Sequence, residues 1–336
     1  MGGALSRGWC CWLVLLAATV AWVARLPLAA LATASAAPPG FTAAHTLTPA
    51  RLAADLAAGV RTTVAPPHLD PPLNTAALSK PVIVDNGCSL QYVAVSSKPC
   101  IYGDPSSRVS VVLFGDSHAA AWFPALDVIS TQQHWRLIDF TKAGCPPAEV
   151  NINFFRGNVP YPACTAWRHN AKRQIAALHP TVVIVSWARF LEPEAREEQG
   201  VPTGHGSAWL NGLADTFGFL HRVARHVIFI SDVPTLRYPA PACVSAHEAD
   251  VYHCTVSRSE SVALPTVKLE ELQLAKREHI TSIDPIPWFC DPTRCPVIVR
   301  NILLYRDNSH MVPAWSRFIA PVLADSILPV VASRSP

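Results

Sequence analysis

The chain has 336 residues, half of them hydrophobic, so it can form one large domain or two small ones with a sizeable core. Its formal charge of +3 is small, and no run of Lys and Arg alternates with aromatic residues. The sequence therefore lacks the charge pattern of nucleic-acid-binding proteins, and no nucleic-acid partner is expected.

The first 36 residues have the pattern of a signal peptide or a single membrane anchor. Arg7 precedes an apolar run over residues 9–24, Arg25 follows, and Ala34-Ser35-Ala36 matches a signal cleavage site. The run is short for a membrane-spanning helix, and it extends toward residue 37 only if Arg25 snorkels. Both alternatives predict that the rest of the chain lies outside the cytoplasm.

Residues 37–81 are rich in Pro, Ala and Thr, and this composition predicts a linker. Within it, Leu52, Leu56 and Val60 are spaced to form one face of a short helix. The folded domain is predicted to span residues 82–331.

From residue 109 onward, apolar runs of strand length alternate with segments of helical periodicity. Such βα repeats predict an α/β fold, with a mostly parallel sheet and helices on both faces. The predicted strands are 109–114, 135–140, 181–186, 227–231 and 280–283, and residues 297–300 and 302–305 are spaced to pair through a tight turn. The predicted helices are 119–132, one that follows Cys164 and ends near Leu178, 209–225, 267–279 and a last one that begins near Pro313.

Ten cysteines are present, and Cys10 and Cys11 lie in the apolar amino-terminal segment. The alternative to disulfides is metal binding, but the chain has no C-x₂-C pair and no His at ligand spacing. The pattern therefore favours disulfides in an exported protein, with no metal and no cofactor. Pairing of sequence neighbours is the working hypothesis: Cys88 with Cys100, Cys145 with Cys164, Cys243 with Cys254, and Cys290 with Cys295.

The first predicted strand ends in Gly115-Asp116-Ser117, and a helical segment follows from Ala119. In open α/β sheets, ligands and catalytic groups lie at the carboxyl ends of the strands. The backbone N–H of Ser117 would also lie near a helix N-terminus, where negative charge is stabilised. Ser117 is therefore a candidate nucleophile. The alternative is that Ser117 only caps the helix.

A serine nucleophile needs a base that accepts its proton, and a carboxylate that orients the base. Asp307 precedes His310 by three residues, in a loop before the last predicted helix. On a turn, this spacing lets the carboxylate reach Nδ1 of the imidazole while Nε2 faces outward. Asp250 and His253 have the same spacing, but they lie in a small loop, which is a poor place to hold a base rigidly. We therefore favour Asp307 and His310.

These motifs resemble the SGNH (GDSL-like) hydrolase superfamily, and more narrowly the extracytoplasmic SGNH domain of actinobacterial acyltransferase-3 proteins. The resemblance rests on Gly115-Asp116-Ser117-His118 and Asp307-x-x-His310, and it covers roughly residues 85 to 330. Further matching segments are Cys88 and Cys100 before Tyr102-Gly103-Asp104, residues 142–147 (KAGCPP), and residues 305–310 (YRDNSH). The resemblance implies a flavodoxin-like three-layer α/β/α sandwich.

The resemblance also implies the roles of the site residues. Ser117 is expected to be the nucleophile, His310 the base and Asp307 the group that orients the base. The backbone N–H groups of Ser117 and Gly144 are expected to bind the oxyanion. His118 is expected either to line the site or to pack in the first helical turn.

One departure from the family concerns the oxyanion hole. SGNH enzymes usually carry a Gly-x-Asn-Asp block after the third strand, and the Asn side chain is another donor. Residues 185–189 here read Val-Ser-Trp-Ala-Arg, with no Asn. We expect Trp187 to replace it through its indole N–H, with Arg189 as second choice and Ser186 as a further candidate. The alternative is that these side chains point into the core or the solvent.

The expected function is an extracytoplasmic, serine-dependent transferase or esterase for O-acyl groups, expected to be acetyl, on a cell-envelope glycan or glycolipid. The alternatives are a carboxylester or lipid hydrolase, and a non-catalytic glycan-binding module, which the missing Asn favours. The fused relatives carry a polytopic membrane domain, whereas this chain has at most one apolar span. The acyl donor would then be a soluble or lipid ester, or a group presented by a separate membrane acyltransferase.

Overall fold

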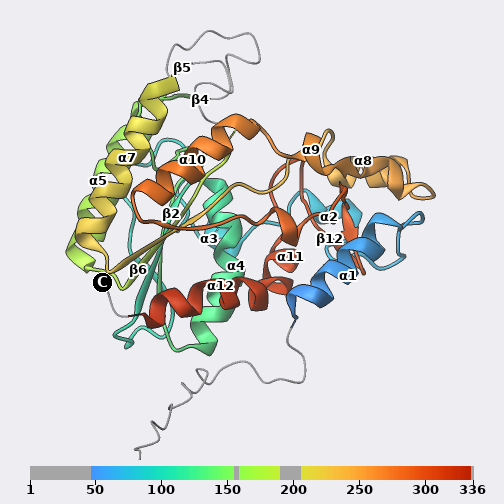
Figure 1. The fold of residues 1–336 in the computed structure, drawn as a ribbon, viewed down its shortest axis with the longest axis horizontal. Coiled ribbons are helices and arrows are strands. Elements are labelled where there is room, and N and C mark those ends of the chain that lie inside the picture. The colour runs from blue at the N-terminus through green and yellow to red at the C-terminus, as the bar shows by residue number, and fades with distance from the viewer. Residues whose placement is uncertain (1–46, 155–158, 190–205, 334–336) are drawn as a thin grey trace, which may run out of the picture. The chain divides into compact units, whose positions relative to one another are not determined.

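The computed structural model describes residues 47–154, 159–189 and 206–333 (Figure 1). The segment predicted as signal peptide or anchor lies outside the described residues, as do Cys10 and Cys11. Among the helices that are described, none combines the length and the apolar character needed to span a bilayer.

A six-stranded sheet forms the centre of the fold, in the order β1-β3-β2-β6-β7-β9. Five strands run parallel, and each lies within one residue of its predicted range, which confirms the mostly parallel sheet. The edge strand β1, which pairs antiparallel with β3, was not predicted, because its residues are only half-buried or exposed. The strands are β1 (Cys100–Gly103), β2 (Ser110–Gly115), β3 (Arg136–Thr141), β6 (Val182–Ser186), β7 (His226–Ile230) and β9 (Thr281–Ile283).

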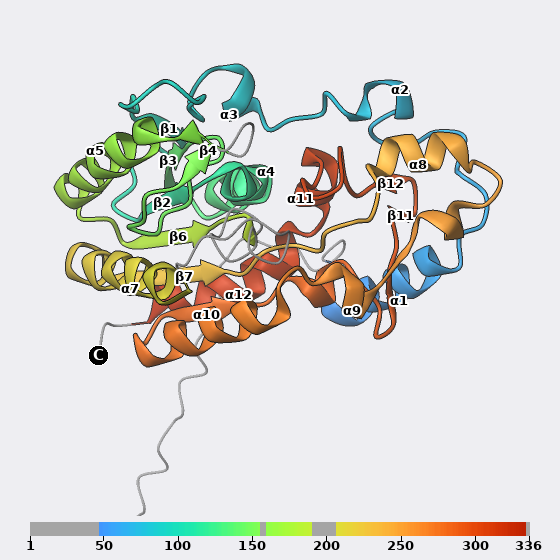
Figure 2. The same cartoon turned by 90° about the horizontal axis from the view of Figure 1, so that it is seen from above.

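Helices cover both faces of this sheet (Figure 2). One face packs on α4 (Ser117–Gln132), α11 (Pro313–Phe318) and α12 (Ala320–Ala332), and the other on α5 (Pro162–Leu178), α7 (Gly206–Val223) and α10 (Pro265–Arg277). Along β2, Val111 and Leu113 belong to the first core, whereas Val112 and Phe114 belong to the second. A strand buried on both faces reads as a continuous apolar run, and the predicted three-layer α/β/α fold is confirmed.

The segment predicted as a linker is packed onto the domain over residues 47–81. Helix α1 (Pro49–Val60) begins after Thr48, whose hydroxyl accepts the N–H of Arg51 at 3.2 Å. Leu52 and Leu56 are 1% and 0% exposed and belong to the same core as α4. The linker prediction is wrong for these residues, because the apolar face of α1 is buried. Two short helices follow, α2 (Leu73–Ala76) and α3 (Val82–Asp85).

After β7 and again after β9, the chain leaves the sheet and forms a lobe. Two small antiparallel pairs lie in this region, β8 with β10 and β11 with β12, and the second pair confirms the predicted tight turn. The elements are α8 (Ala240–Ala246), η2 (Val251–Cys254), β8 (Val256–Ser257), α9 (Arg258–Ser261), η3 (Ile286–Trp288), β10 (Arg294–Cys295), β11 (Ile298–Val299) and β12 (Ile302–Leu303). Elsewhere, β4 (Asn153–Phe154) pairs with β5 (Val159–Pro160).

Four disulfides link the eight cysteines in the predicted nearest-neighbour pairs. They are Cys88–Cys100, Cys145–Cys164, Cys243–Cys254 and Cys290–Cys295. Within the described ranges, no group of three or more His, Cys, Asp or Glu side chains is placed to hold a metal ion.

Candidate active site

The site begins where β2 turns into α4. Gly115 has a φ of +151°, and a Cβ there would lie 2.0 Å from the carbonyl oxygen of Ser186 and 2.9 Å from the Cβ of Ala119. Only glycine allows β2 to lie this close to β6 and still turn at once into a helix. This turn places Ser117, the first residue of α4, at the carboxyl end of the sheet.

Asp116 is the N-cap of α4. One carboxylate oxygen accepts the N–H of His118 and the other accepts the N–H of Ala188, both at 2.8 Å. Burial raises the pKa of Asp116 to about 6. Because Asp116 caps the helix and joins it to the end of β6, the alternative that Ser117 serves as the cap is wrong.

The structure brings Ser117, His310 and Asp307 together in one chain of hydrogen bonds. The hydroxyl oxygen of Ser117 lies 2.9 Å from Nε2 of His310, and Nδ1 of His310 lies 2.8 Å from Oδ2 of Asp307. The other oxygen of Asp307 accepts the backbone N–H groups of Ser309 and His310. The network assigns the proton of neutral His310 to Nδ1, which leaves Nε2 free to accept the serine proton.

The loop that carries His310 is held at its base and along its side. Tyr305 and Met311, both fully buried, form an antiparallel bridge, and the N–H of Arg306 donates to the carbonyl of His310 at 3.0 Å. From the lobe, the N–H of Leu236 donates to the carbonyl of Asn308 at 2.7 Å. A catalytic group needs this kind of support to keep its geometry.

The second Asp-x-x-His pair is placed differently. His253 is exposed and stacks on His247, with ring centroids 4.0 Å apart, and its backbone N–H donates to the backbone carbonyl of Asp250. His310, rather than His253, is therefore the histidine that contacts Ser117.

Burial and neighbouring charges set the protonation states of the site. Burial is the main reason that the pKa of His310 falls to about 4, and the charge of nearby His118 lowers it further, against the opposing effect of Asp307. Burial alone would raise the pKa of Asp307, but the hydrogen bonds from His310 outweigh it and hold that pKa well below its usual range. At neutral pH the arrangement is therefore a neutral imidazole beside an ionised carboxylate.

A buried His–Asp pair that sequence reasoning missed lies beside this chain. Nδ1 of His118 lies 2.6 Å from Asp232, and the His118 ring meets the His310 ring edge-on, with centroids 4.6 Å apart. Burial alone would lower the pKa of His118, but the charge and hydrogen bond of Asp232, together with the charges of Asp116 and Asp307, outweigh burial and raise that pKa. The sequence offers one indication of this pair. Asp232 follows β7 by two residues, so it lies at the same edge of the sheet as Ser117.

The expected oxyanion role of Trp187 is wrong. Its indole N–H donates to Oε1 of the fully buried Glu271 at 2.8 Å, and its ring stacks on Phe229 at 4.3 Å in the core beneath α7 and α10. Arg189, the second choice, makes other contacts as well. Its guanidinium contacts Glu271 at 3.2 Å and donates to Ser231. The hydroxyl of Ser186 is buried without a hydrogen-bond partner among the described residues.

Gly144 lies in the turn after β3, next to the end of β2. The N–H of Lys142 donates to the carbonyl of Gly115 at 3.0 Å, and Gly144 adopts the left-handed conformation with a φ of +59°. Burial lowers the pKa of Lys142 to about 8, and its ammonium donates to the carbonyls of Gln91, Tyr92 and Ala94, each at 2.7 Å. This lysine fixes the turn, and Gly144 lies half-buried beside the site.

The fold and this geometry define an α/β protein with a serine, a histidine and an aspartate joined at the carboxyl end of its sheet. Residues 87–325 match the family model described as "SGNH domain (fused to AT3 domains)". The chain therefore belongs to this SGNH family, as its sequence motifs predicted.

Two solved structures are similar to this chain at low sequence identity, and the first of them supports the fold. The periplasmic domain of the lipopolysaccharide acetyltransferase of Salmonella ser. Paratyphi A has a TM-score of 0.52 and 16% identity, and the match covers 74% of this chain and 88% of that chain. A catalytic mutant of the acetylxylan esterase of Geobacillus stearothermophilus has a TM-score of 0.38 and 11% identity, covering 69% and 96% of the two chains. A comparison with curated protein sequences finds no match.

Proposed function

We propose that the chain is an extracytoplasmic, serine-dependent O-acyltransferase or esterase that acts on a cell-envelope glycan or glycolipid, with acetyl as the transferred group. The observation that carries this proposal is the 2.9 Å contact between the Ser117 hydroxyl and His310, whose other nitrogen bonds to Asp307. Membership of the SGNH family supports the reaction class. The four disulfides support the location outside the cytoplasm.

In the proposed reaction, Ser117 attacks the carbonyl carbon of an ester while Nε2 of His310 accepts the hydroxyl proton. The backbone N–H groups of Ser117 and Gly144 stabilise the oxyanion of the tetrahedral intermediate. His310 then returns its proton to the departing alcohol, which leaves an acyl-serine and a neutral imidazole. A sugar hydroxyl or a water molecule attacks the acyl-serine in the second half, and His310 again accepts and returns the proton. Asp307 keeps the imidazole oriented throughout.

The identity of the second nucleophile separates a transferase from a hydrolase. The family description names fusion to AT3 domains, which supports a membrane acyltransferase as the partner that presents the acyl group. A soluble or lipid ester is the alternative donor. A screen of acyl esters with and without a glycan acceptor measures which nucleophile is used.

A serine-directed fluorophosphonate tests the nucleophile directly. We expect covalent labelling of the wild-type protein and none of Ser117→Ala, measured by intact-protein mass spectrometry. Labelling that persists in Ser117→Ala would remove Ser117 from its proposed role. No labelling of the wild-type protein would favour the binding-module alternative.

A further inference from the structure

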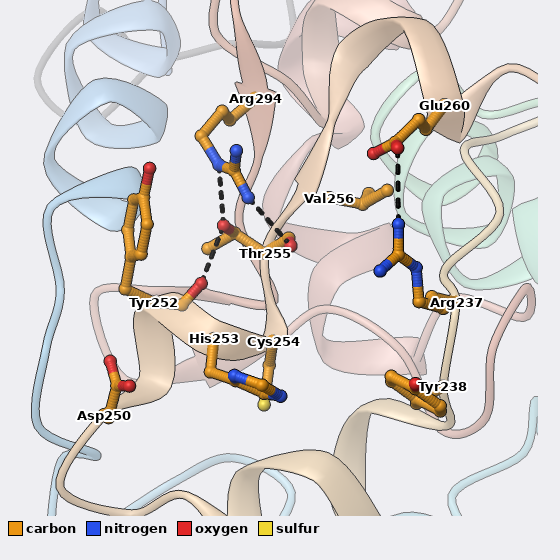
Figure 3. A pocket seen from close by; sticks show the side chains of 10 residues that line it. All are labelled: Arg237, Tyr238, Asp250, Tyr252, His253, Cys254, Thr255, Val256, Glu260 and Arg294. Atoms are coloured by element: carbon orange, nitrogen blue, oxygen red, sulfur yellow. Dashed lines mark hydrogen bonds and ion pairs between the residues drawn. The ribbon is translucent and has the colours of Figure 1, made fainter.

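The lobe contains a pocket outside the proposed triad, with a volume of about 370 Å³. We call it the tyrosine pocket, and Figure 3 shows the side chains that form it. Two disulfides brace its walls, because Cys254 lines the pocket and bonds to Cys243, and Cys295 follows the lining residue Arg294 and bonds to Cys290. Its lining residues are Arg237, Tyr238, Asp250, Tyr252, His253, Cys254, Thr255, Val256, Glu260 and Arg294.

Two aromatic rings of the tyrosine pocket face solvent. Tyr238 is 55% exposed and Tyr252 is 45% exposed, which is high for rings that line a concavity. The guanidinium of Arg294 lies 4.8 Å from the centre of the Tyr252 ring and is fixed by hydrogen bonds to Thr255. Tyr238, on the opposite side of the pocket in Figure 3, offers an aromatic surface on which a ligand can stack.

The charges of the tyrosine pocket balance. The positive charges of Arg237 and Arg294 are matched in number by the negative charges of Asp250 and Glu260, and Arg237 contacts Glu260 at 3.3 Å. That pair is more than half exposed on both sides, so it stabilises little and leaves both groups accessible to a ligand. A polyanion gains little from such a pocket. A neutral polyhydroxyl ligand fits it better, because its hydroxyls can donate to carboxylates and accept from guanidinium groups.

The tyrosine pocket adjoins the loop that carries the proposed base. The N–H of Leu236 donates to the carbonyl of Asn308 at 2.7 Å, and the N–H of Ala240 donates to the carbonyl of Asp307 at 3.1 Å. Tyr238 lies midway between these two attachment points. A ligand held on Tyr238 therefore lies close to the proposed catalytic loop rather than at a remote surface.

We propose that the tyrosine pocket is a subsite for a neutral pyranose unit of the glycan substrate, with Tyr238 as its stacking platform. The apolar C–H face of a pyranose packs against an aromatic ring, while its rim hydroxyls reach Arg237 and Glu260, which lie on the same side of the pocket as Tyr238 in Figure 3. This assignment rests on the proposed function, since it places the sugar on the same glycan as the hydroxyl that carries the acyl group, in a different sugar residue.

The test compares two esters, an O-acetylated neutral glucan tetrasaccharide and an O-acetylated methyl glucoside. The quantity measured is the ratio of their kcat/KM values, in wild type, Tyr238→Ala and Tyr238→Phe. We expect the ratio, tetrasaccharide over methyl glucoside, to be about ten in wild type, to fall to near one in Tyr238→Ala, and to be retained in Tyr238→Phe, which keeps the ring. Leu269→Ala, an exposed change on α10, is the control for substitution itself and should leave the ratio unchanged. An unchanged ratio in Tyr238→Ala overturns the proposal.

A binding measurement separates failure of the subsite from failure of the enzyme. Calorimetric titration of Ser117→Ala with the unacylated glucan tetrasaccharide measures binding without chemistry, and Ser117→Ala/Tyr238→Ala should bind about tenfold more weakly. Equal binding by both variants, or tighter binding of an anionic uronic-acid tetrasaccharide than of the neutral one, overturns the subsite whatever the enzyme assays show. Hydrolysis of neither ester by the wild type, with binding still dependent on Tyr238, contradicts the proposed function and leaves the subsite supported.

Discussion

Replacing His118 with Gln should move the acid limb of the pH–rate profile to higher pH. In wild type the pKa of His310 is about 4, so kcat/KM for a small ester should fall only as the pH drops toward that value. Below it, His310 carries a proton and can no longer accept one from Ser117. The positive charge of His118, which Asp232 stabilises beside the His310 ring, contributes to this low pKa. The Gln side chain removes that charge.

The size of the shift follows from the spacing of the charges. A unit charge at the 4.6 Å ring separation acts on His310 with about 3.6 kcal/mol at an effective dielectric constant of ~20. The substitution leaves Asp232 in place, so the whole of this interaction is lost. An energy of about 3.6 kcal/mol corresponds to about 2.6 pKa units. The acid limb should therefore move from near pH 4 to above pH 6.

The assay is kcat/KM for a small acetyl ester between pH 3.5 and 8, with the rate of fluorophosphonate labelling as a second readout. Asp232→Asn is the matched variant, because without Asp232 the buried His118 loses the charge that keeps it protonated, and the limb should shift in the same direction. Asp307 and Arg306, the other charged groups that act on His310, stay in place in both variants. A limb that stays near pH 4, or moves to lower pH, would refute the electrostatic role of His118.

Three further predictions follow from the described contacts. His310→Ala should lower kcat/KM for a small ester by several powers of ten, and His253→Ala by far less; the reverse order would sink the choice between the two Asp-x-x-His pairs. Trp187→Phe should cost about 1–3 kcal/mol in the free energy of unfolding, because Glu271 loses a buried donor. It should change kcat/KM only a few-fold, and a hundredfold loss of kcat would show that Trp187 does contribute to the oxyanion hole. Leu56→Ala should cost about 2–5 kcal/mol in urea unfolding, and a cost near zero would mean that α1 is a linker after all.

The parallel strands could be predicted because each is buried on both faces and therefore forms an unbroken apolar run. The edge strand β1 and helix α1 have weaker hydrophobic patterns in the sequence than the parallel strands. Strand β1 has half-buried and exposed residues, and α1 lies in a stretch whose Pro, Ala and Thr content is typical of linkers. The burial of Leu52 and Leu56 depends on tertiary contacts that composition does not record. The Asp307-x-x-His310 spacing was informative because both partners lie on one short loop.

Residues 187–189 show why the remainder of the site could not be predicted. The N–H of Ala188 bonds to Asp116, the N–H of Arg189 bonds to Asp232, and both the Trp187 indole and the Arg189 guanidinium bond to Glu271. These carboxylates come from the start of α4, the end of β7 and the middle of α10, so no local spacing reveals them. The segment that holds an oxyanion donor in other SGNH enzymes instead fixes Asp232, which in turn holds His118 beside His310.

This arrangement has a consequence for the proposed enzyme. Neither Trp187 nor Arg189 supplies a third oxyanion donor, and loss of one such donor costs about 10²–10³ in kcat where it has been measured. Interactions with distant parts of a substrate can offset such a loss when they position the reacting ester. We therefore expect slow turnover of small esters and a larger kcat for glycans that reach the tyrosine pocket. An equal kcat for the methyl glucoside and the tetrasaccharide would contradict the expectation that binding in the tyrosine pocket raises kcat.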